Sequence, residues 1–313
     1  MHARDITVGT VAVRTIALAA AAALLALVVV GGQPARATYP GSTDGRLAMG
    51  AEVAGNVDIY TVLPNGVGAQ RLTSDPLFDA CPAWSADGKR IAWCRGIRAR
   101  GGNIEIWTMK LDGTEQVQLT NLGGRMTFPD FAPNGSRIAF SGRLPGATSD
   151  DVFSIGVDGT GLTRLTDDPA NDALPAYSPD GSKIAFISAR SGLEQVWVMG
   201  ADGTNATQLT FDELFKGQVP DWSPDGSRIA YAAGDPGDVL VMNVDGSGQH
   251  TLIGGPTDDF GPAWSPDGQQ LAFIRFDDRT VYVANADGTG EHVVRALGLQ
   301  AVPAWQPRGD RRP

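Results

Sequence analysis

Three aspartates are spaced so that they could hold a metal ion. Asp79, Asp172 and Asp259 each stand three residues before a proline in a sequence that recurs along the chain. The intervening copies hold Met126, Gly217 and Gln300 at this place. If the copies form a ring, three carboxylates surround the mouth of a central channel, where Ca²⁺ can bind carboxylate, carbonyl and water oxygens. The alternative is that each aspartate caps its own turn.

A second group of functional candidates is basic, although the chain carries a net charge of −10. Seven arginines fall in segments of variable length between the recurring sequences: Arg95, Arg98, Arg100, Arg143, Arg190, Arg275 and Arg279. Guanidinium groups pair well with carboxylates, so this set predicts a face that binds a partner. The alternative is that these are solvated loop arginines.

The two cysteines, Cys81 and Cys94, flank one turn of the chain. If Trp84 lies opposite Ile91 in a hairpin, the same register places Cys81 opposite Cys94, close enough for a disulfide. We therefore expect a cross-strand disulfide, with two buried thiols as the alternative. Two cysteines also exclude a Cys₄ zinc site and a disulfide-scaffold mini-protein.

Residues for metal-independent catalysis are scarce. Beyond residue 37 the sequence has two histidines, His250 and His292, which we expect at the surface. No Gly-x-Ser-x-Gly, His-Glu-x-x-His or phosphate-binding glycine motif occurs. The negative net charge excludes a nucleic-acid binder that uses a basic face.

The N-terminal segment is typical of an export signal. Arg4 and Arg14 precede an apolar stretch at 16–30, and Ala35-Arg36-Ala37 fits the small-x-small cleavage rule. We expect residues 1–37 to be a cleaved signal peptide, with an uncleaved anchor as the alternative. No later apolar run is long enough to span a membrane. The mature protein is then expected in the periplasm, at the cell surface or outside the cell.

The elements that must position these residues are repeats. The motif Pro262-Ala-Trp-Ser-Pro-Asp-Gly recurs at Pro82, Pro129, Pro175, Pro220 and, partly, Pro303. A period of 41 to 47 residues suits a four-stranded propeller blade. In each unit we expect a first strand with an aromatic residue, an Asp-Gly turn, a second strand such as Ile184-Ala-Phe186, a third strand, and a fourth that ends in Arg/Gln-Leu-Thr. The small alanine makes room for the neighbouring blade.

The two ends of the repeat region complement each other. The segment 45–73 reads as a second, third and fourth strand, and 303–306 as a first strand without followers. Together they make one blade, which removes open sheet edges. We expect an all-β, six-bladed β-propeller of four-stranded antiparallel blades, closed by the C-terminal strand pairing with the N-terminal blade.

The repeat resembles the TolB-type, WD-like β-propeller repeat over residues 39–313. That resemblance implies an exported propeller that mainly binds proteins. Members of the family often have Asp three residues before the proline of the repeat, and this chain resembles them in three of its copies. TolB carries an α/β domain before its propeller, whereas here few residues separate the expected cleavage site from the first unit. We therefore expect a TolB-like propeller without that domain.

The expected organisation is a signal peptide at 1–37 and a propeller at 38–313. The expected function is a monomeric, non-catalytic scaffold that binds a protein, peptide or cell-wall component on its variable loops, without nucleic acid or a membrane span. Because some six-bladed propellers are metal-assisted lactonases or sugar lyases, the alternative is a metal-assisted hydrolase or lyase of that type. That alternative would use the carboxylates at the channel mouth, with Ca²⁺ as the one cofactor considered.

Overall fold

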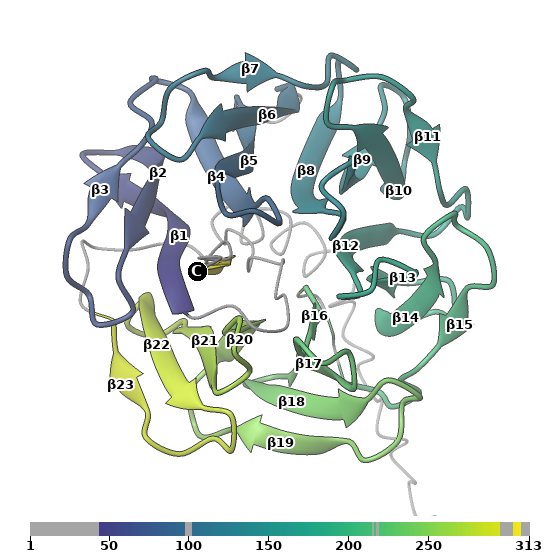
Figure 1. Ribbon diagram of the computed structural model, residues 1–313. Coiled ribbons are helices and arrows are strands. Elements are labelled where there is room, and N and C mark those ends of the chain that lie inside the picture. Colours follow the sequence, from purple (N-terminus) through teal and green to yellow (C-terminus); the bar gives the residue numbers. More distant parts are fainter. Residues whose placement is uncertain (1–43, 98–101, 215, 217–218, 295–302, 308–313) are drawn as a thin grey trace, which may run out of the picture.

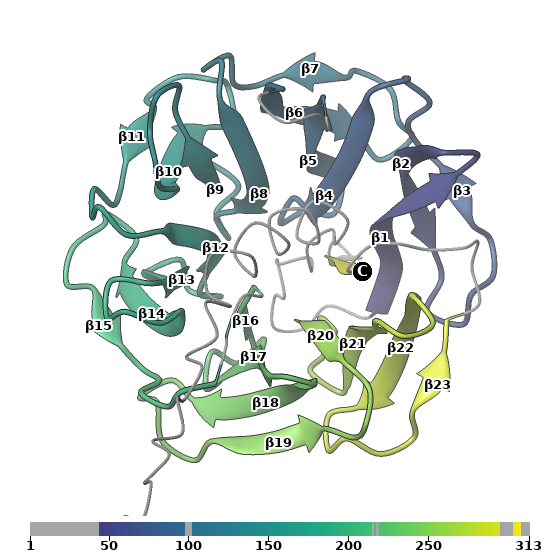
Figure 2. The ribbon, with the colours of Figure 1, turned by 180° about the vertical axis from the view of Figure 1, so that it is seen from behind.

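The computed structural model describes residues 44–97, 102–214, 216, 219–294 and 303–307. These residues form β-strands and turns, with no helix among them and so none that could cross a membrane. The strands are arranged around a central area, with β24, β4, β8, β12, β16 and β20 innermost and the fourth strands, such as β7 and β23, at the periphery (Figures 1 and 2). The expected signal peptide at 1–37 lies outside the described residues.

The strands follow the order expected from the repeats. The first sheet contains β24 (Ala304–Pro307), β1 (Asp44–Val53), β2 (Asn56–Val62) and β3 (Gln70–Arg71), in that order. An eight-stranded sheet contains β4 (Phe78–Trp84), β5 (Arg90–Gly96), β6 (Ile104–Lys110), β7 (Val117–Gln118), β8 (Arg125–Phe131), β9 (Arg137–Arg143), β10 (Asp151–Gly156) and β11 (Thr163–Arg164).

Three further sheets have four strands each. One contains β12 (Asp172–Tyr177), β13 (Lys183–Ser188), β14 (Gln195–Gly200) and β15 (Thr207–Gln208). The next contains β16 (Asp221–Trp222), β17 (Arg228–Gly234), β18 (Gly237–Asn243) and β19 (His250–Ile253). The last contains β20 (Asp259–Trp264), β21 (Gln270–Arg275), β22 (Thr280–Asn285) and β23 (His292–Val293).

We call each antiparallel set of four strands a blade and name it by its strands. The pairing departs from separate four-stranded sheets at one place, because Ile104 of β6 pairs in parallel with Arg125 of β8. This single pairing joins blades β4–β7 and β8–β11 into the eight-stranded sheet. The C-terminal strand β24 pairs antiparallel with β1, with Leu47 opposite Trp305.

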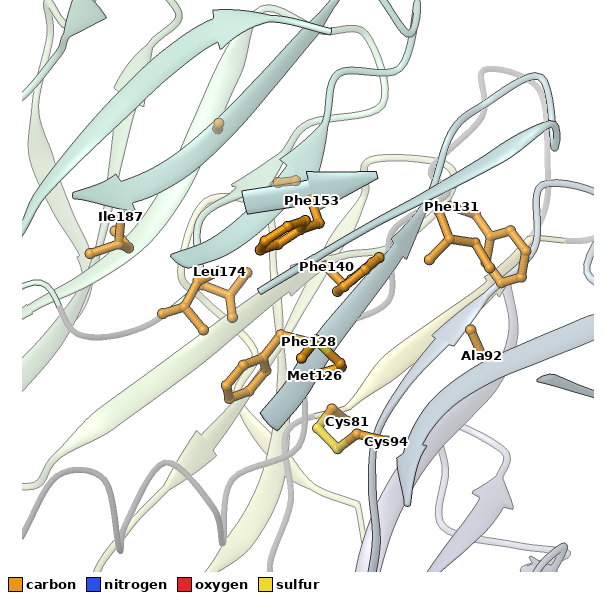
Figure 3. Close-up of a cluster of buried hydrophobic side chains, with 14 of the residues drawn as sticks. Cys81, Ala92, Cys94, Met126, Phe128, Phe131, Phe140, Phe153, Leu174 and Ile187 are labelled. Carbon is orange, nitrogen blue, oxygen red and sulfur yellow. A yellow bond between two sulfur atoms is a disulfide. The ribbon is translucent and has the colours of Figure 1, made fainter. Parts of the chain in front are cut away.

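Neighbouring blades pack large side chains against alanines. Trp84, Ile91 and Trp93 on one face of blade β4–β7 contact a cluster that includes Ala48 and Ala304. The opposite face of the same blade presents Ala92, Cys94 and Ile106 to a cluster that contains the aromatic residues of blade β8–β11 (Figure 3). Adjacent residues on a strand face opposite sides of the sheet, so the Ile-Ala-aromatic sequence supplies one bulky and one small surface.

A recurring bulge bends the innermost strands. The register between the first and second strands shifts in blades β4–β7, β8–β11, β12–β15 and β20–β23. The residue before the template proline, such as Cys81 (φ 50°) or Leu174 (φ 61°), takes a left-handed conformation there. An extra residue on one strand with increased local twist is the signature of a β-bulge.

The bulge corrects the expected position of the cysteines. Cys81 and Cys94 form the expected disulfide, with their Cα atoms 5.7 Å apart. The expected register was wrong at this point, because Cys94 pairs with Ala80 rather than with Cys81. Cys81 is the bulged residue, and its side chain turns toward Cys94 from that position (Figure 3).

Candidate functional site

The two faces of the propeller differ in the segments that cover them. Strand direction alternates within a blade, so the segments between second and third strands lie on the same face as the segments that enter each first strand. We call this the variable face; the opposite turn face carries the Asp-Gly turns. Exposed apolar side chains occur in the segments of the variable face, including Ile97 (53% exposed), Leu193 (52%) and Phe211 (76%).

Each of the three aspartates meets an arginine on the variable face. Asp79 accepts hydrogen bonds from Arg95 through Nε (2.6 Å) and Nη2 (2.8 Å). Asp259 is paired in the same way with Arg275, at 2.8 and 2.9 Å. Asp172 accepts one bond from Nη2 of Arg190, at 2.5 Å. All three aspartates are fully buried, so these are charge-assisted bonds shielded from solvent.

The same three arginines also lie over aromatic rings of the third strands of their blades. The guanidinium carbon of Arg95 is 4.9 Å from the centroid of the Trp107 ring, and that of Arg275 is 4.5 Å from Tyr282. Arg190 lies 4.9 Å from the ring of Trp197. The aromatic ring and the aspartate carboxylate thus contact each guanidinium group from two sides.

Burial and ion pairing shift the pKa values of these groups in opposite directions. Burial raises the pKa of Asp259, although its bonds with Arg275 act against that rise. Hydrogen bonds to Asp259 raise the pKa of Arg275. Burial lowers the pKa of Arg95, but the hydrogen bonds and charge of Asp79 outweigh it and raise this pKa overall. Both arginines therefore stay charged at any physiological pH.

The predicted metal site and the predicted arginine-rich binding face thus share one set of aspartate–arginine ion pairs. The structure brings each aspartate to an arginine rather than to the other aspartates, and no group of three His, Cys, Asp or Glu side chains in the described part of the chain is placed to hold a metal ion. The calcium site on Asp79, Asp172 and Asp259 stays a prediction, and the ion-pair geometry does not support it.

The remaining arginines of the predicted binding face are placed differently. Arg143 is partly exposed and binds both carboxylate oxygens of Asp150, at 3.0 and 2.7 Å. Arg279 is exposed in the turn just before β22. Arg98 and Arg100 lie outside the described residues. Because Arg95, Arg143, Arg190 and Arg275 are already paired, Arg279 is the described member best able to meet a partner's carboxylate.

Sequence reasoning missed the aspartate–arginine pairs, although the repeats contain a signal for them. Blades with Asp before the template proline have Arg at or just after the end of the second strand. Blade β8–β11 has Met126 in place of the aspartate and Gly142 opposite it, while Arg143 at the end of β9 pairs with Asp150 instead. A Cβ on Gly142 would meet the Phe153 ring and the Met126 sulfur, so no side chain fits there.

The Arg/Gln-Leu-Thr sequences have a structural role that was also missed. The threonine hydroxyl accepts a hydrogen bond from an amide of the third strand, 2.9 Å long from Ile59 to Thr73 and from Val196 to Thr210. The same hydroxyl donates to the residue that starts the third strand, as in Thr210 to Gln195 (2.6 Å). These hydrogen bonds connect the end of the fourth strand to the start of the third strand, on the side of the blade nearest the variable face.

A further residue of the variable face, Glu194, was not predicted from the sequence. Glu194 precedes β14 at the place where Ile104 and Val57 stand in two other blades. Its Oε2 atom is buried and has no hydrogen-bond partner in the described structure. Burial, together with the charge of Asp150, raises the pKa of Glu194 to about 7. His250 and His292 are exposed, as expected.

Comparison with known proteins gives one family match. The model of the TolB beta propeller domain family matches residues 103–260. An uncharacterized protein, Atu1656, of Agrobacterium fabrum is 34% identical over 106 residues, which are 34% of this chain and 35% of that protein. A TolB homolog of Chlorobium luteolum is 33% identical over 76 residues, 24% of this chain and 16% of that protein. The chain thus matches well under two thirds of either relative's length.

Among solved structures, TolB from Acinetobacter baumannii is similar to this chain with a TM-score of 0.72. The superposition covers 86% of this chain and 68% of that one, at 23% sequence identity. At this identity the likeness shows the fold: an all-β propeller with four-stranded antiparallel blades.

Proposed function

Because the chain belongs to the TolB beta propeller domain family, we propose that it is a non-catalytic scaffold that binds a protein, peptide or cell-wall component on its variable face. The observation that carries this proposal is the contrast between the faces. The segments of the variable face differ in length and sequence from blade to blade, whereas the turn face repeats one Asp-Gly turn; exposed apolar side chains occur on both faces. Variable loops on a repeated framework are a common binding arrangement.

The proposed scaffold is a closed ring of six blades. The pairing of β24 with β1 supports closure, since it places the C-terminal strand in the N-terminal sheet. Side-chain packing gives further support, because Trp305 lies in one cluster with Ala263 of β20 and Ala304 lies in another with Trp84 of β4. The blade that contains β24 therefore contacts both of its neighbours.

We also propose that the protein is exported. The disulfide between Cys81 and Cys94 supports an oxidising compartment, where such bonds persist. The sequence at 1–37 has the features of a signal peptide, and its removal would leave a propeller in the periplasm, at the cell surface or outside the cell.

The experiment that tests the function is affinity capture from an envelope extract with face-specific variants. Phe211→Ala and Arg279→Ala change exposed side chains of the variable face, and Val157→Ala changes an exposed side chain (41%) of the turn face. We expect the first two to lose a captured component that Val157→Ala retains. Equal capture by all three variants would contradict binding through the variable face.

A further inference from the structure

One arginine of the variable face has no carboxylate partner. Arg125 begins β8, and its guanidinium makes no hydrogen bond or ion pair with the residues that the structure describes. By contrast, Arg95, Arg143, Arg190 and Arg275 each donate to an aspartate. Arg125 is partly buried, and this burial lowers its pKa. Withdrawing a cation from water without a counter-ion is unfavourable, so Arg125 is suited to an anion supplied from outside the chain.

A second arginine lies beside Arg125. The antiparallel pairing of β8 with β9 places Arg125 directly opposite Arg143, and such residues have their Cβ atoms about 5 Å apart on one face of the sheet. Both oxygens of Asp150 accept bonds from Arg143, from Nε at 3.0 Å and from Nη2 at 2.7 Å. The charges of Arg143 and Asp150 both act on Arg125. Two positive charges and one negative charge leave this group with a net charge of +1.

The other copies of the repeat show how a cation at this position is neutralised within the chain. Among them, only the copy that leads into β16 has a cation four residues before the template proline, Lys216. Lys216 is fully buried and pairs with Asp212, four residues earlier in the same segment. The segment that leads into β8 has Asn121 at the place of Asp212, and residues 119–124 contain no acidic residue. Arg125 therefore lacks the internal counter-ion that Lys216 has.

Two segments with apolar residues border the pair of arginines. Leu122 stands just before Arg125 and is partly buried, and Leu144 follows Arg143 and is 36% exposed. The two segments lie side by side, since a Cβ on Gly123 would be 3.7 Å from Cγ of Pro145. A ligand on the arginines therefore has apolar side chains next to it.

These surroundings select the class of ligand. Arg125 is partly exposed, and the side chains of Arg143 and Asp150 are 22% and 25% exposed, so the group is open to solvent. A carboxylate carries the one negative charge that balances the group, and its two oxygens match the fork of a guanidinium. A phosphate dianion would leave excess negative charge beside Asp150. The apolar neighbours favour a peptide over an acidic sugar, because a peptide can bury an apolar side chain there.

We propose that Arg125 binds a carboxylate of a partner polypeptide. The Arg125 guanidinium donates to both carboxylate oxygens, while Arg143 stays paired with Asp150. An apolar side chain next to that carboxylate packs against Leu144. This inference rests on the proposed function, because it assigns a contact to the partner that binds the variable face.

Saturation-transfer NMR titrations with three short peptides test the site. N-acetyl-alanyl-leucine has a C-terminal carboxylate, N-acetyl-glutamyl-leucinamide has a side-chain carboxylate, and N-acetyl-alanyl-leucinamide has neither. We expect one of the two acids to bind about tenfold more tightly than the neutral amide, the effect of charge-assisted hydrogen bonds, and the tighter acid identifies the source of the carboxylate. Arg125→Met should abolish this preference. Arg279→Met is the matched control, since it removes an exposed arginine of the same face in another blade and should keep the preference.

Four results would overturn the proposal: no preference for either acid over the amide, a preference that persists in folded Arg125→Met, an equal loss in Arg279→Met, or tighter binding of D-galacturonate than of both acids. The last result would assign the site to an acidic carbohydrate.

A second variant decides if Arg125→Met does not fold. Asn121→Asp changes an exposed side chain and places a carboxylate where Asp212 serves Lys216, so it should weaken binding of the acids by competing for Arg125. Unchanged binding would overturn the proposal. If face-dependent capture persists without a preference for the acids, the carboxylate inference fails alone. If the acids bind through Arg125 but capture is independent of face, the proposed function fails.

Discussion

Trp84 on β4 donates a hydrogen bond from Nε1 to the carbonyl oxygen of Ala304 on β24, at 3.1 Å, and so joins residues 220 positions apart. Trp305 on β24 makes the corresponding bond to the carbonyl of Ala263 on β20, at 3.0 Å. The two bonds thus link the blade that contains β24 to blade β4–β7 and to blade β20–β23. These two bonds support the proposed closed ring independently of the sheet pairing.

A matched pair of tryptophan variants tests that link. Trp84 and Trp264 are both fully buried at the same template position, but Trp264 Nε1 has no hydrogen-bond partner in the described structure. We expect Trp84→Phe to lower the free energy of unfolding by about 1–2 kcal/mol more than Trp264→Phe, because it leaves the Ala304 carbonyl unsatisfied. Urea unfolding measures both; equal losses would contradict a stabilising role for the bond.

The disulfide should stabilise the innermost strands. Replacement of Cys81 and Cys94 by serine is expected to cost about 3 kcal/mol, the loop-closure effect for cysteines 13 residues apart. Urea unfolding of the double variant and of the reduced wild type should give similar losses. Thiol labelling of the folded, unreduced protein should find no free cysteine, and two labelled thiols would refute the bond.

The ion pairs predict a large difference between two arginines. Arg95→Ala leaves Asp79 buried without its counter-ion, and we expect a loss of about 3–5 kcal/mol in the free energy of unfolding. Arg279→Ala removes an exposed guanidinium and should change stability by less than about 0.5 kcal/mol. Comparable losses in the two variants would show that Arg95 does not neutralise a buried charge.

Glu194 should make stability depend on pH. Its pKa is raised to about 7 in the folded protein, above the ordinary glutamate value of 4.5. The folded state then holds the proton more tightly than the unfolded state, so this group's contribution to stability falls as pH rises from about 4.5 to 7. We expect Glu194→Gln to abolish a loss on the order of 3 kcal/mol over that range.

Chemical unfolding at pH 5 and pH 8 measures this effect. Glu213→Gln, at an exposed glutamate on the same face, is the control and should keep the wild-type pH dependence. If Glu194→Gln and wild type lost the same stability between the two pH values, the buried carboxyl would not be the titrating group.

The strand order and the buried faces were predictable because the repeats act as an internal alignment. Every first-strand aromatic, from Trp84 to Trp305, is buried as expected. The bulge was not predictable at Cys81, Phe128 or Leu174, because residues with side chains rarely adopt a positive φ and nothing in their types signals one. A one-residue error there changed the expected partner of Cys94.

The same bulge made the candidate site harder to predict. The aspartates and the arginines were each recognised, but as two separate surfaces, because Asp79 lies opposite Arg95 and Asp259 opposite Arg275 only after the register shift. Glu194 gave no signal, because a glutamate in a variable loop is ordinarily solvated.

Hydrogen exchange of the protein with its captured partner tests the choice of binding face most directly. We expect protection in the segments between β5 and β6, β9 and β10, β13 and β14, and β17 and β18, with unchanged exchange in the Asp-Gly turns of the turn face. Protection confined to those turns, at Asp112-Gly113, Asp158-Gly159 and Asp202-Gly203, would contradict the proposed function.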